Sequence, residues 1–265
     1  MKSYDNTIKY YELLMFYKDT SIYEKYLLPV GFHFEFYKDG DMEEWINIHI
    51  ESGEFCAIEE GIMIFHDFYD SFIQELNKRC VFIVDDKTNE KVGTATISLL
   101  DKEEYGCNGE VDWVAIKKNY QGKGLAKPLI TKILEISNKL GHKSIVLHTQ
   151  TTTWLAARLY LNFGFNILNS NENTGWSILK TLTNHPKLNE FKILKKEEIY
   201  DKRNVQIELQ LKQLFKSDNF NYSVWYKNGL HNVYVYYKNI TYEYEYFDYN
   251  NKIVLKEVEN KKYKR

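Results

Sequence analysis

A short basic turn with two glycines stands at the mouth of a predicted helix, in the stretch VAIKKNYQGKGLAKPLITKILEI. An apolar run ends at Ile116, the turn follows, and apolar residues then recur at helical spacing. Backbone N–H groups at a helix N-terminus lack intrahelical partners and carry the positive end of the helix dipole, so they attract anions. Glycine has no Cβ and lets the backbone approach a ligand closely. Since Lys123 and Lys127 add full positive charges, the turn suits a pyrophosphate.

Two common phosphate-binding motifs are excluded by the residues of this turn. A P-loop needs G-x-x-x-x-G-K-[ST], which the sequence does not contain. The dinucleotide-binding fingerprint needs a third glycine where Lys127 stands. That fingerprint also opens the first βα unit of its domain, whereas this turn comes after a predicted hairpin and two predicted helices.

The elements before and after the turn predict an α/β fold, with a mixed sheet of the α+β kind. Alternation and β-branched runs predict strands, whereas helical spacing and capping residues predict helices. Strands are expected at 31–39, 109–116, 144–151, 165–168 and 175–182, and a hairpin at 80–100 with its polar turn at 87–90. Helices are expected at 41–55 with Asp41 as N-cap, at 58–79, after the glycine turn, and at 152–165 with Gly164 as the stop. The two short strands at 165–168 and 175–182 would flank a turn at 169–175.

The character of the chain changes after residue 185, where we place a boundary between a main domain (1–185) and an accessory region (186–265). A helix is expected at 198–215, followed by aromatic strands at 219–227, 231–238 and 240–248. Asn228 and Gly229 form a strong hairpin turn signal. In the last strand the tyrosines at 242, 244 and 246 share one face and the glutamates at 243 and 245 the other. We therefore predict a small helix plus an antiparallel β extension for this region.

Composition narrows the class of protein. The chain has 265 residues, 44% hydrophobic and 27% charged, an ordinary globular mix. No apolar run is long enough for a membrane span, and acids interrupt the N-terminal segment where a signal peptide is apolar, so we expect a cytoplasmic protein. The three cysteines, Cys56, Cys80 and Cys107, form no paired framework and no zinc spacing, so no metal is expected. Residues 1–185 carry a net charge of −7 and the remainder +5, so nucleic acid is not an expected partner.

The turn and its surroundings resemble the GNAT family of acetyl-CoA-dependent N-acetyltransferases. Gln121, Gly122, Lys123, Gly124, Leu125 and Ala126 match the family's [QR]-x-x-G-x-[GA] pyrophosphate loop, which follows a strand and opens a helix. About 30 residues later, Ala156, Tyr160, Gly164 and Phe165 are in register with the family's A-x-x-x-Y-x-x-x-G-F element. The resemblance spans residues 1 to 182, and its specific motifs lie between 111 and 165.

The resemblance implies roles for particular residues. Acetyl-CoA would be the cosubstrate, its pyrophosphate held by residues 121–126. The N–H of Val114 would polarise the thioester carbonyl, and Ala115 and Ile116 would offer backbone bonds to the pantetheine arm. Tyr160 would protonate the leaving thiolate. Where many members carry an asparagine that touches the cofactor, this chain has Thr153.

The general base is less well defined by the sequence. The resemblance places it on or near the strand 109–116, where Glu110 and Asp112 share one face. We predict Asp112, directly or through water, because an acceptor amine must lose a proton before attack. His148 is an alternative base or a polar strand end. His49, Glu51 and Glu54 are predicted near the acceptor site, where acids would suit a cationic acceptor.

The predicted activity is acetyl transfer to a primary amine of a small molecule or peptide, by direct attack in a ternary complex. The alternative is a non-catalytic acyl-CoA sensor or scaffold whose aromatic tail binds a partner. For the tyrosine-faced strands we expect a hydrophobic core or a homodimer contact, and a lid or a glycan- or peptide-binding face remains open. The acceptor itself is not specified by any motif.

Overall fold

The computed structural model describes residues 4–104, 107–168, 173–227, 230–249 and 252–258. In these residues one main sheet has the strand order β2-β3-β4-β5-β6-β1-β7. Strands β5 and β6 run parallel and the other neighbours run antiparallel. The strands are β1 (Glu12–Tyr17), β2 (Phe32–Phe36), β3 (Cys80–Asp85), β4 (Glu90–Glu104), β5 (Cys107–Ile116), β6 (Ile145–Gln150) and β7 (Asn166–Ile167).

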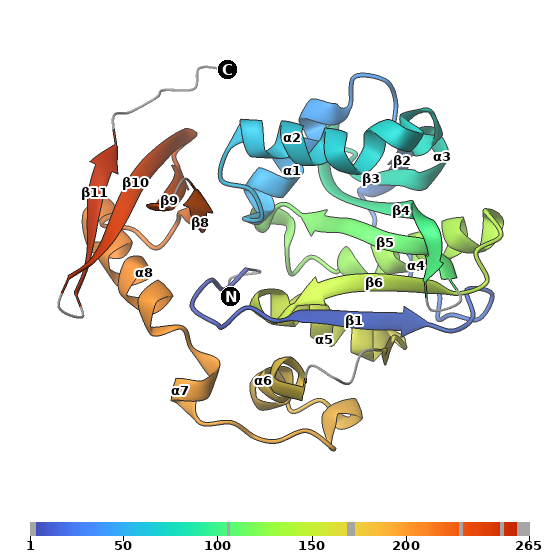
Figure 1. Cartoon of the computed structure of the whole chain (residues 1–265). Helices are drawn as coiled ribbons and strands as arrows, with labels where there is room; N and C mark the ends of the chain where they lie inside the picture. Colours follow the sequence, from blue (N-terminus) through green and yellow to red (C-terminus); the bar gives the residue numbers. More distant parts are fainter. Residues whose placement is uncertain (1–3, 105–106, 169–172, 228–229, 250–251, 259–265) are drawn as a thin grey trace.

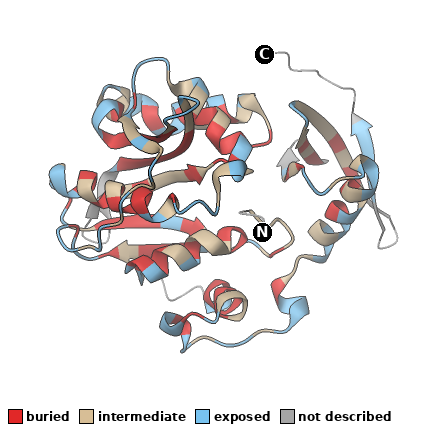
Figure 2. Cartoon of the chain, turned by 180° about the vertical axis from the view of Figure 1, so that it is seen from behind, coloured by how far each residue is buried: buried red, intermediate tan, exposed pale blue. Residues whose placement is uncertain are grey.

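Helices cover the two faces of this sheet (Figure 1). On one face α1 (Met42–Ser52) and α2 (Ile58–Tyr69) bury Trp45 and Phe65 against Phe82 of β3. On the other, α4 (Ala126–Lys139), α5 (Trp154–Phe163) and α6 (Asn173–Thr183) enclose the larger core. Figure 2 shows buried residues along the strands and on the helix sides that face them. The mixed α/β fold predicted from the sequence is confirmed.

The C-terminal region forms a second sheet with its own core. After α7 (Lys196–Ile199), helix α8 (Lys202–Phe215) precedes the meander β8 (Asn221–Lys227), β9 (Leu230–Tyr237), β10 (Ile240–Tyr249) and β11 (Lys252–Val258). Tyr244 and Tyr246 pack with Ile207 and Leu211 of α8. The tyrosine face is therefore internal to this module, as a hydrophobic core. The boundary near 185 stays a prediction, and Leu188 still packs in the main core.

Three sequence predictions differ from the structure. Residues 175–182 form most of helix α6 and no strand, with Trp176 and Leu179 one turn apart on its buried side. The helix predicted at 58–79 ends at Tyr69, because Phe72 has non-helical dihedrals and divides a 3₁₀ turn, after which α3 (Leu76–Arg79) begins. Strands β1 and β11 were not predicted. The predicted turn at 228–229 and most of that at 169–175 lie outside the described residues.

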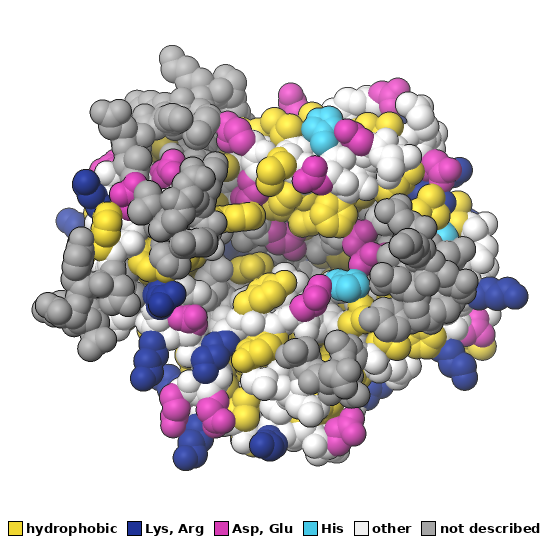
Figure 3. Space-filling model, in the orientation of Figure 1, with side chains coloured by type: hydrophobic (Ala, Val, Ile, Leu, Met, Phe, Trp, Pro, Cys, Tyr) yellow, Lys and Arg dark blue, Asp and Glu magenta, His cyan; other side chains and the backbone are white. Residues whose placement is uncertain are grey.

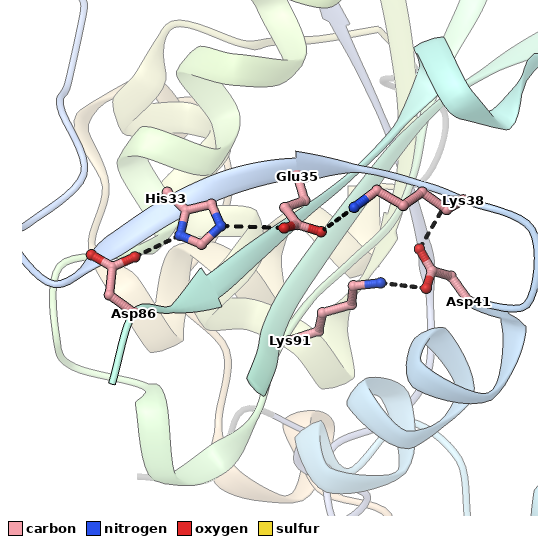
Figure 4. Close-up of polar contacts among 6 residues, drawn as sticks. All are labelled: His33, Glu35, Lys38, Asp41, Asp86 and Lys91. Atoms are coloured by element: carbon pink, nitrogen blue, oxygen red, sulfur yellow. Dashed lines mark hydrogen bonds and ion pairs between the residues drawn. The ribbon is translucent and has the colours of Figure 1, made fainter. Parts of the chain in front are cut away.

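Charged side chains line the exposed edge strand β2. His33 contacts Asp86 at 2.5 Å and Glu35 at 3.4 Å, and Lys38 binds Glu35 at 2.9 Å (Figure 4). The Asp86 contact raises the pKa of His33. These exposed pairs contribute little stability. Their charge discourages another strand from pairing with the edge.

No helix among the described residues is long and apolar enough to cross a membrane.

Gly61 of α2 is expected to resist substitution because α1 packs directly on it. A Cβ at this position would lie 2.6 Å from Ile46 Cγ2 and 3.2 Å from Phe55 Cδ2. Gly61→Ala would ordinarily stabilise a helix, but overpacking should lower the free energy of unfolding by about 1–3 kcal/mol. Thermal unfolding measures this, with the exposed neighbour variant Glu59→Ala as control. A Gly61→Ala protein as stable as the wild type would contradict the close packing.

Candidate active site

An opening between β5 and β6 organises the site. Parallel pairing of these strands is confined to Glu110 with Val146 and Val111 with Leu147. Beyond Val111 the strands diverge toward their C-terminal ends (Figure 1). A β-strand whose pairing stops leaves backbone N–H and C=O groups that need other partners. The backbone groups along the diverging edges can therefore hydrogen-bond an extended ligand.

A β-bulge lies beside this opening on the β4 side. Thr94 pairs with Ala115 and Thr96 with Asp112, so Trp113 and Val114 together oppose one residue of β4. Trp113 has a φ of 49°, which is uncommon for a large side chain. Bulges of this kind bend a strand and re-aim its side chains, and strained residues concentrate at functional sites. The bulge turns β5 away from β6 where Val114 was predicted to act.

A cavity of about 700 Å³ occupies the opening. Its walls come from the N-terminal segment, β1, the α1–α2 region, β5, β6, α5 and β8. Figure 3 shows acidic and hydrophobic side chains around a hollow in the middle of this face. The residues that line it include Tyr4, Tyr10, Glu12, Glu54, Glu60, Glu110, Asp112, Trp113, Val114, His148, Thr153, Tyr160 and Trp225.

Asp112, the predicted base, lies in this cavity. Burial raises the pKa of its carboxyl to about 6, while Ser98 and then the charge of His148 act in the opposite direction. A carboxyl group with such a pKa is mostly ionised at neutral pH and yet accepts a proton more readily than an ordinary aspartate. Its environment therefore suits a general base.

Tyr160, the predicted acid, lines the same cavity from α5 and is 6% exposed. Burial, and then the charge of Glu54, raise the pKa of its phenol, so it is protonated at neutral pH. Its ring packs at 5.7 Å from that of Phe165. The helix that carries it ends at Gly164, which has a φ of 117° and was the predicted stop.

His49 and Glu54 form a pair at the edge of the cavity. The buried His49 ring contacts Glu54 through Nδ1 and lies against Trp45 and Trp113, with centroid distances of 4.3 and 5.5 Å. Glu54 lines the cavity, whereas His49 does not. Glu51, predicted in the same neighbourhood, instead pairs with Lys117 at 3.2 Å. Of the three residues, Glu54 alone reaches the cavity.

His148 joins two acids on the sheet surface. Its Nδ1 lies 2.9 Å from Glu12 and its Nε2 lies 3.6 Å from Glu110. It shares a face of β6 with Val146, opposite the face that packs on α4 and α5. His148 lines the cavity from this face. Its role as an alternative base or as a polar strand end stays a prediction.

The glycine turn stands where β5 ends and α4 begins. Gly122 and Gly124 have φ values of 78° and 82°, which side chains other than glycine rarely adopt. Within the described residues, the backbone N–H groups of residues 122–127 donate to no protein acceptor. This arrangement fits a pyrophosphate, the ligand that the sequence predicts for the turn.

The side chains of the turn have separate structural roles. Gln121 Nε2 donates to the Ile116 carbonyl at 2.9 Å and braces the turn against β5. Leu125 is buried in the main core, so only its backbone is available to a ligand. Lys123 lies over Tyr120 at 4.0 Å from the ring centroid and Lys127 over Tyr26 at 4.4 Å. Both lysines are exposed and stand beside the turn with Ala126.

Thr153 lines the cavity wall at the start of α5. Its hydroxyl donates to the Gln150 carbonyl at 3.1 Å and lies 3.2 Å from the Thr149 hydroxyl. Ala115 pairs with Thr94, and its side chain packs with the core beneath α1 and α2. The predicted contacts of Thr153, Ala115 and Ile116 with a cofactor stay predictions.

Sequence reasoning missed several residues of the cavity. Glu12, Glu60, Tyr4 and Tyr10 come from segments without a motif. Trp225 comes from the accessory module, on the face of β8 opposite Tyr222 and Val224. For Trp225, the one signal available in the sequence was a large aromatic side chain on the outer face of a predicted strand. No group of three or more potential metal ligands occurs in the described part of the chain.

A known protein family matches much of the part of the chain that forms the main sheet. Residues 34–165 match the model of the acetyltransferase (GNAT) family, so the chain carries a domain of that family. Similar solved structures include a GCN5-related N-acetyltransferase from Sphaerobacter thermophilus, with 15% identity, coverage of 62% of this chain and 50% of that chain, and a TM-score of 0.49. A glucosamine-6-phosphate N-acetyltransferase from Arabidopsis thaliana has 14% identity, coverage of 52% and 93%, and a TM-score of 0.39.

A third similar structure is a tandem GNAT protein from the clavulanic acid biosynthesis pathway, with 12% identity, coverage of 62% and 52%, and a TM-score of 0.45. The chain spans half the length or less of the first structures that it matches. No curated protein sequence matched.

Asp112→Asn is expected to stabilise the fold at neutral pH. The native state holds the Asp112 proton more tightly than the unfolded state, whose aspartate has an ordinary pKa. Between about pH 4 and pH 6, stability therefore falls as pH rises, and the ionised carboxylate is unfavourable above this range. Denaturant unfolding at pH 8 should show a gain of about 1–3 kcal/mol for Asp112→Asn, with little difference at pH 4. Asp39→Asn, at an exposed position, is the control. A loss of stability at pH 8 would contradict the buried charge.

Proposed function

We propose that the chain is an acetyl-CoA-dependent N-acetyltransferase that acts on a primary amine of a small molecule or peptide. The observation that carries the proposal is the opening between β5 and β6, with Asp112 and Tyr160 on its walls and the glycine turn at the end of β5. The family of the domain at residues 34–165 supports the same activity.

The cavity and the glycine turn can together seat the two reactants of a direct transfer, although residues 115–127, all described in the structure, do not line the cavity itself. The free N–H groups of residues 122–127 would hold the pyrophosphate, with Lys123 and Lys127 adding charge. The backbone of Val114, beside the divergence, would donate to the thioester carbonyl oxygen, and such a donor contributes about 3 kcal/mol in other enzymes. The volume of about 700 Å³ lies in the range of small-molecule sites.

Asp112 would take the proton that the amine must lose. An ordinary alkylamine is about one part in a thousand neutral near pH 7, so deprotonation limits the reaction. The neutral nitrogen then attacks the carbonyl carbon and a C–N bond forms. As the C–S bond breaks, the nitrogen releases its second proton to solvent. Tyr160 would give its proton to the departing thiolate and recover one from solvent. The products are an N-acetyl amine and coenzyme A.

The rival role as a non-catalytic acyl-CoA sensor is less well supported. It requires the aromatic tail to be a binding surface, yet the tyrosine face of β10 is packed on α8. The cavity also holds both a base and an acid candidate, which a passive sensor does not need. Acetyl transfer above background to any amine excludes the rival.

Tyr160→Phe is expected to lower kcat by about 10²-fold while the dissociation constant of acetyl-CoA changes little. The change removes one hydroxyl and keeps the ring against Phe165. Steady-state kinetics and calorimetry separate the two effects, with Tyr236→Phe as a control outside the cavity. An unchanged kcat would remove Tyr160 from the mechanism.

The pH dependence of kcat/KM should report Asp112. Asp112 must be ionised to take a proton from the ammonium group, so one proton must be lost from the enzyme below pH 6 and none above it while the amine stays protonated. The slope of log(kcat/KM) against pH is therefore expected to fall from about one to about zero near pH 6. In Asp112→Asn this break should vanish and the rate at pH 7 should fall by about 10²-fold or more. A break that persists in the variant would assign the base elsewhere.

A further inference from the structure

The accessory module completes one end of the cavity. Trp225 stands on the outer face of β8, 42% exposed, and lines the cavity together with residues of the main domain. Its indole Nε1 donates to Ser223 Oγ at 2.8 Å, which fixes the ring. An aromatic face held at a cavity wall is a binding surface for a cation.

Specific hydrogen bonds tie this strand to the α1–α2 region. Asn221 Nδ2 donates to the Ile50 carbonyl at 2.8 Å, and Thr241 Oγ1 donates to the Cys56 carbonyl at 3.0 Å. The N–H of Cys56 in turn donates to Glu60 Oε2 at 2.9 Å. Ser223, the partner of Trp225, interacts with the same Cys56. Trp225 and Glu60 are therefore anchored to one short segment and reach the same cavity.

The carboxylates of the cavity fall into two groups. Glu12, Glu110 and Asp112 surround His148 on the sheet, at the opening where transfer would occur. Glu54 and Glu60 come from the α1–α2 region, and Glu60 shares its segment with Trp225. No lysine or arginine stands among the described residues that line the cavity. A ligand with two positively charged groups could therefore place one beside each group of carboxylates.

We propose that the acceptor is an organic dication, an alkylamine with a second ammonium group a few carbons away. Its reacting amine lies at Asp112, and its second ammonium is held by Glu60 and the face of Trp225. This inference rests on the proposed acetyltransferase function and adds the substrate class. It makes the accessory module a specificity element of the active site.

The test compares two acceptors of equal length. Tetramethylenediamine carries an ammonium group where n-pentylamine carries a methyl group. With acetyl-CoA as donor, we expect kcat/KM for the diamine to exceed that for the monoamine by about 10-fold or more. Trp225→Ala and Glu60→Gln should each reduce this ratio several-fold, and Trp225→Phe should keep part of it. Glu59→Gln, exposed on the same helix and outside the cavity, is the matched control.

The outcomes separate the inference from the function on which it rests. Calorimetric binding of acetyl-CoA shows whether each variant is folded. Equal kcat/KM for the two amines, or a preference that survives both Trp225→Ala and Glu60→Gln, overturns the inference and leaves the acetyltransferase function standing. Absence of transfer to any amine contradicts the proposed function, and the inference fails with it.

Discussion

The structure depends on one interruption in backbone pairing, the early end of the ladder between β5 and β6. Two residue pairs join these strands, and a bulge with Trp113 in a left-handed conformation then bends β5. Because the strands diverge, backbone groups of β5 face a cavity and not a neighbouring strand. The same bend sets Asp112 on the cavity wall, and the chain then enters the glycine turn. The proposed cosubstrate seat, the candidate base and the glycine turn are thus positioned by one irregular strand.

The cavity gathers several acids, and burial raises the carboxyl pKa of two of them, Asp112 and Glu60. Asp112 is the clearest case, since burial raises the pKa of its carboxyl to about 6. Such a group weakens the fold at neutral pH, and active sites tolerate this cost when function needs it. The well-packed cores on both sides, and the hydrogen bonds that attach β8 to the α1–α2 region, hold the acids in place.

Local chemistry made much of the fold predictable. Residues close together in the sequence determine three of its elements: the β3–β4 hairpin, the glycine turn and the helix that ends at Gly164. Residues 175–182 were misread because a short apolar run serves a strand or a buried helix equally well. Tyr160 was predicted from motif register, and Asp112 from the strand on which the family resemblance places the base. Glu60, Glu12 and Trp225 were not, because their roles arise only when distant segments meet.

The central claim is that the diverging strand and its glycine turn bind acetyl-CoA. The direct measurement is calorimetric titration of acetyl-CoA into the wild type and into Gly124→Glu, which puts a carboxylate at the pyrophosphate seat. Gly40→Glu is the control, because Gly40 has a similar positive φ and open surroundings but lies outside the glycine turn. Micromolar binding by the wild type and Gly40→Glu, lost in Gly124→Glu, is the predicted result. Wild-type protein that does not bind acetyl-CoA, or equal binding by all three, would contradict the account.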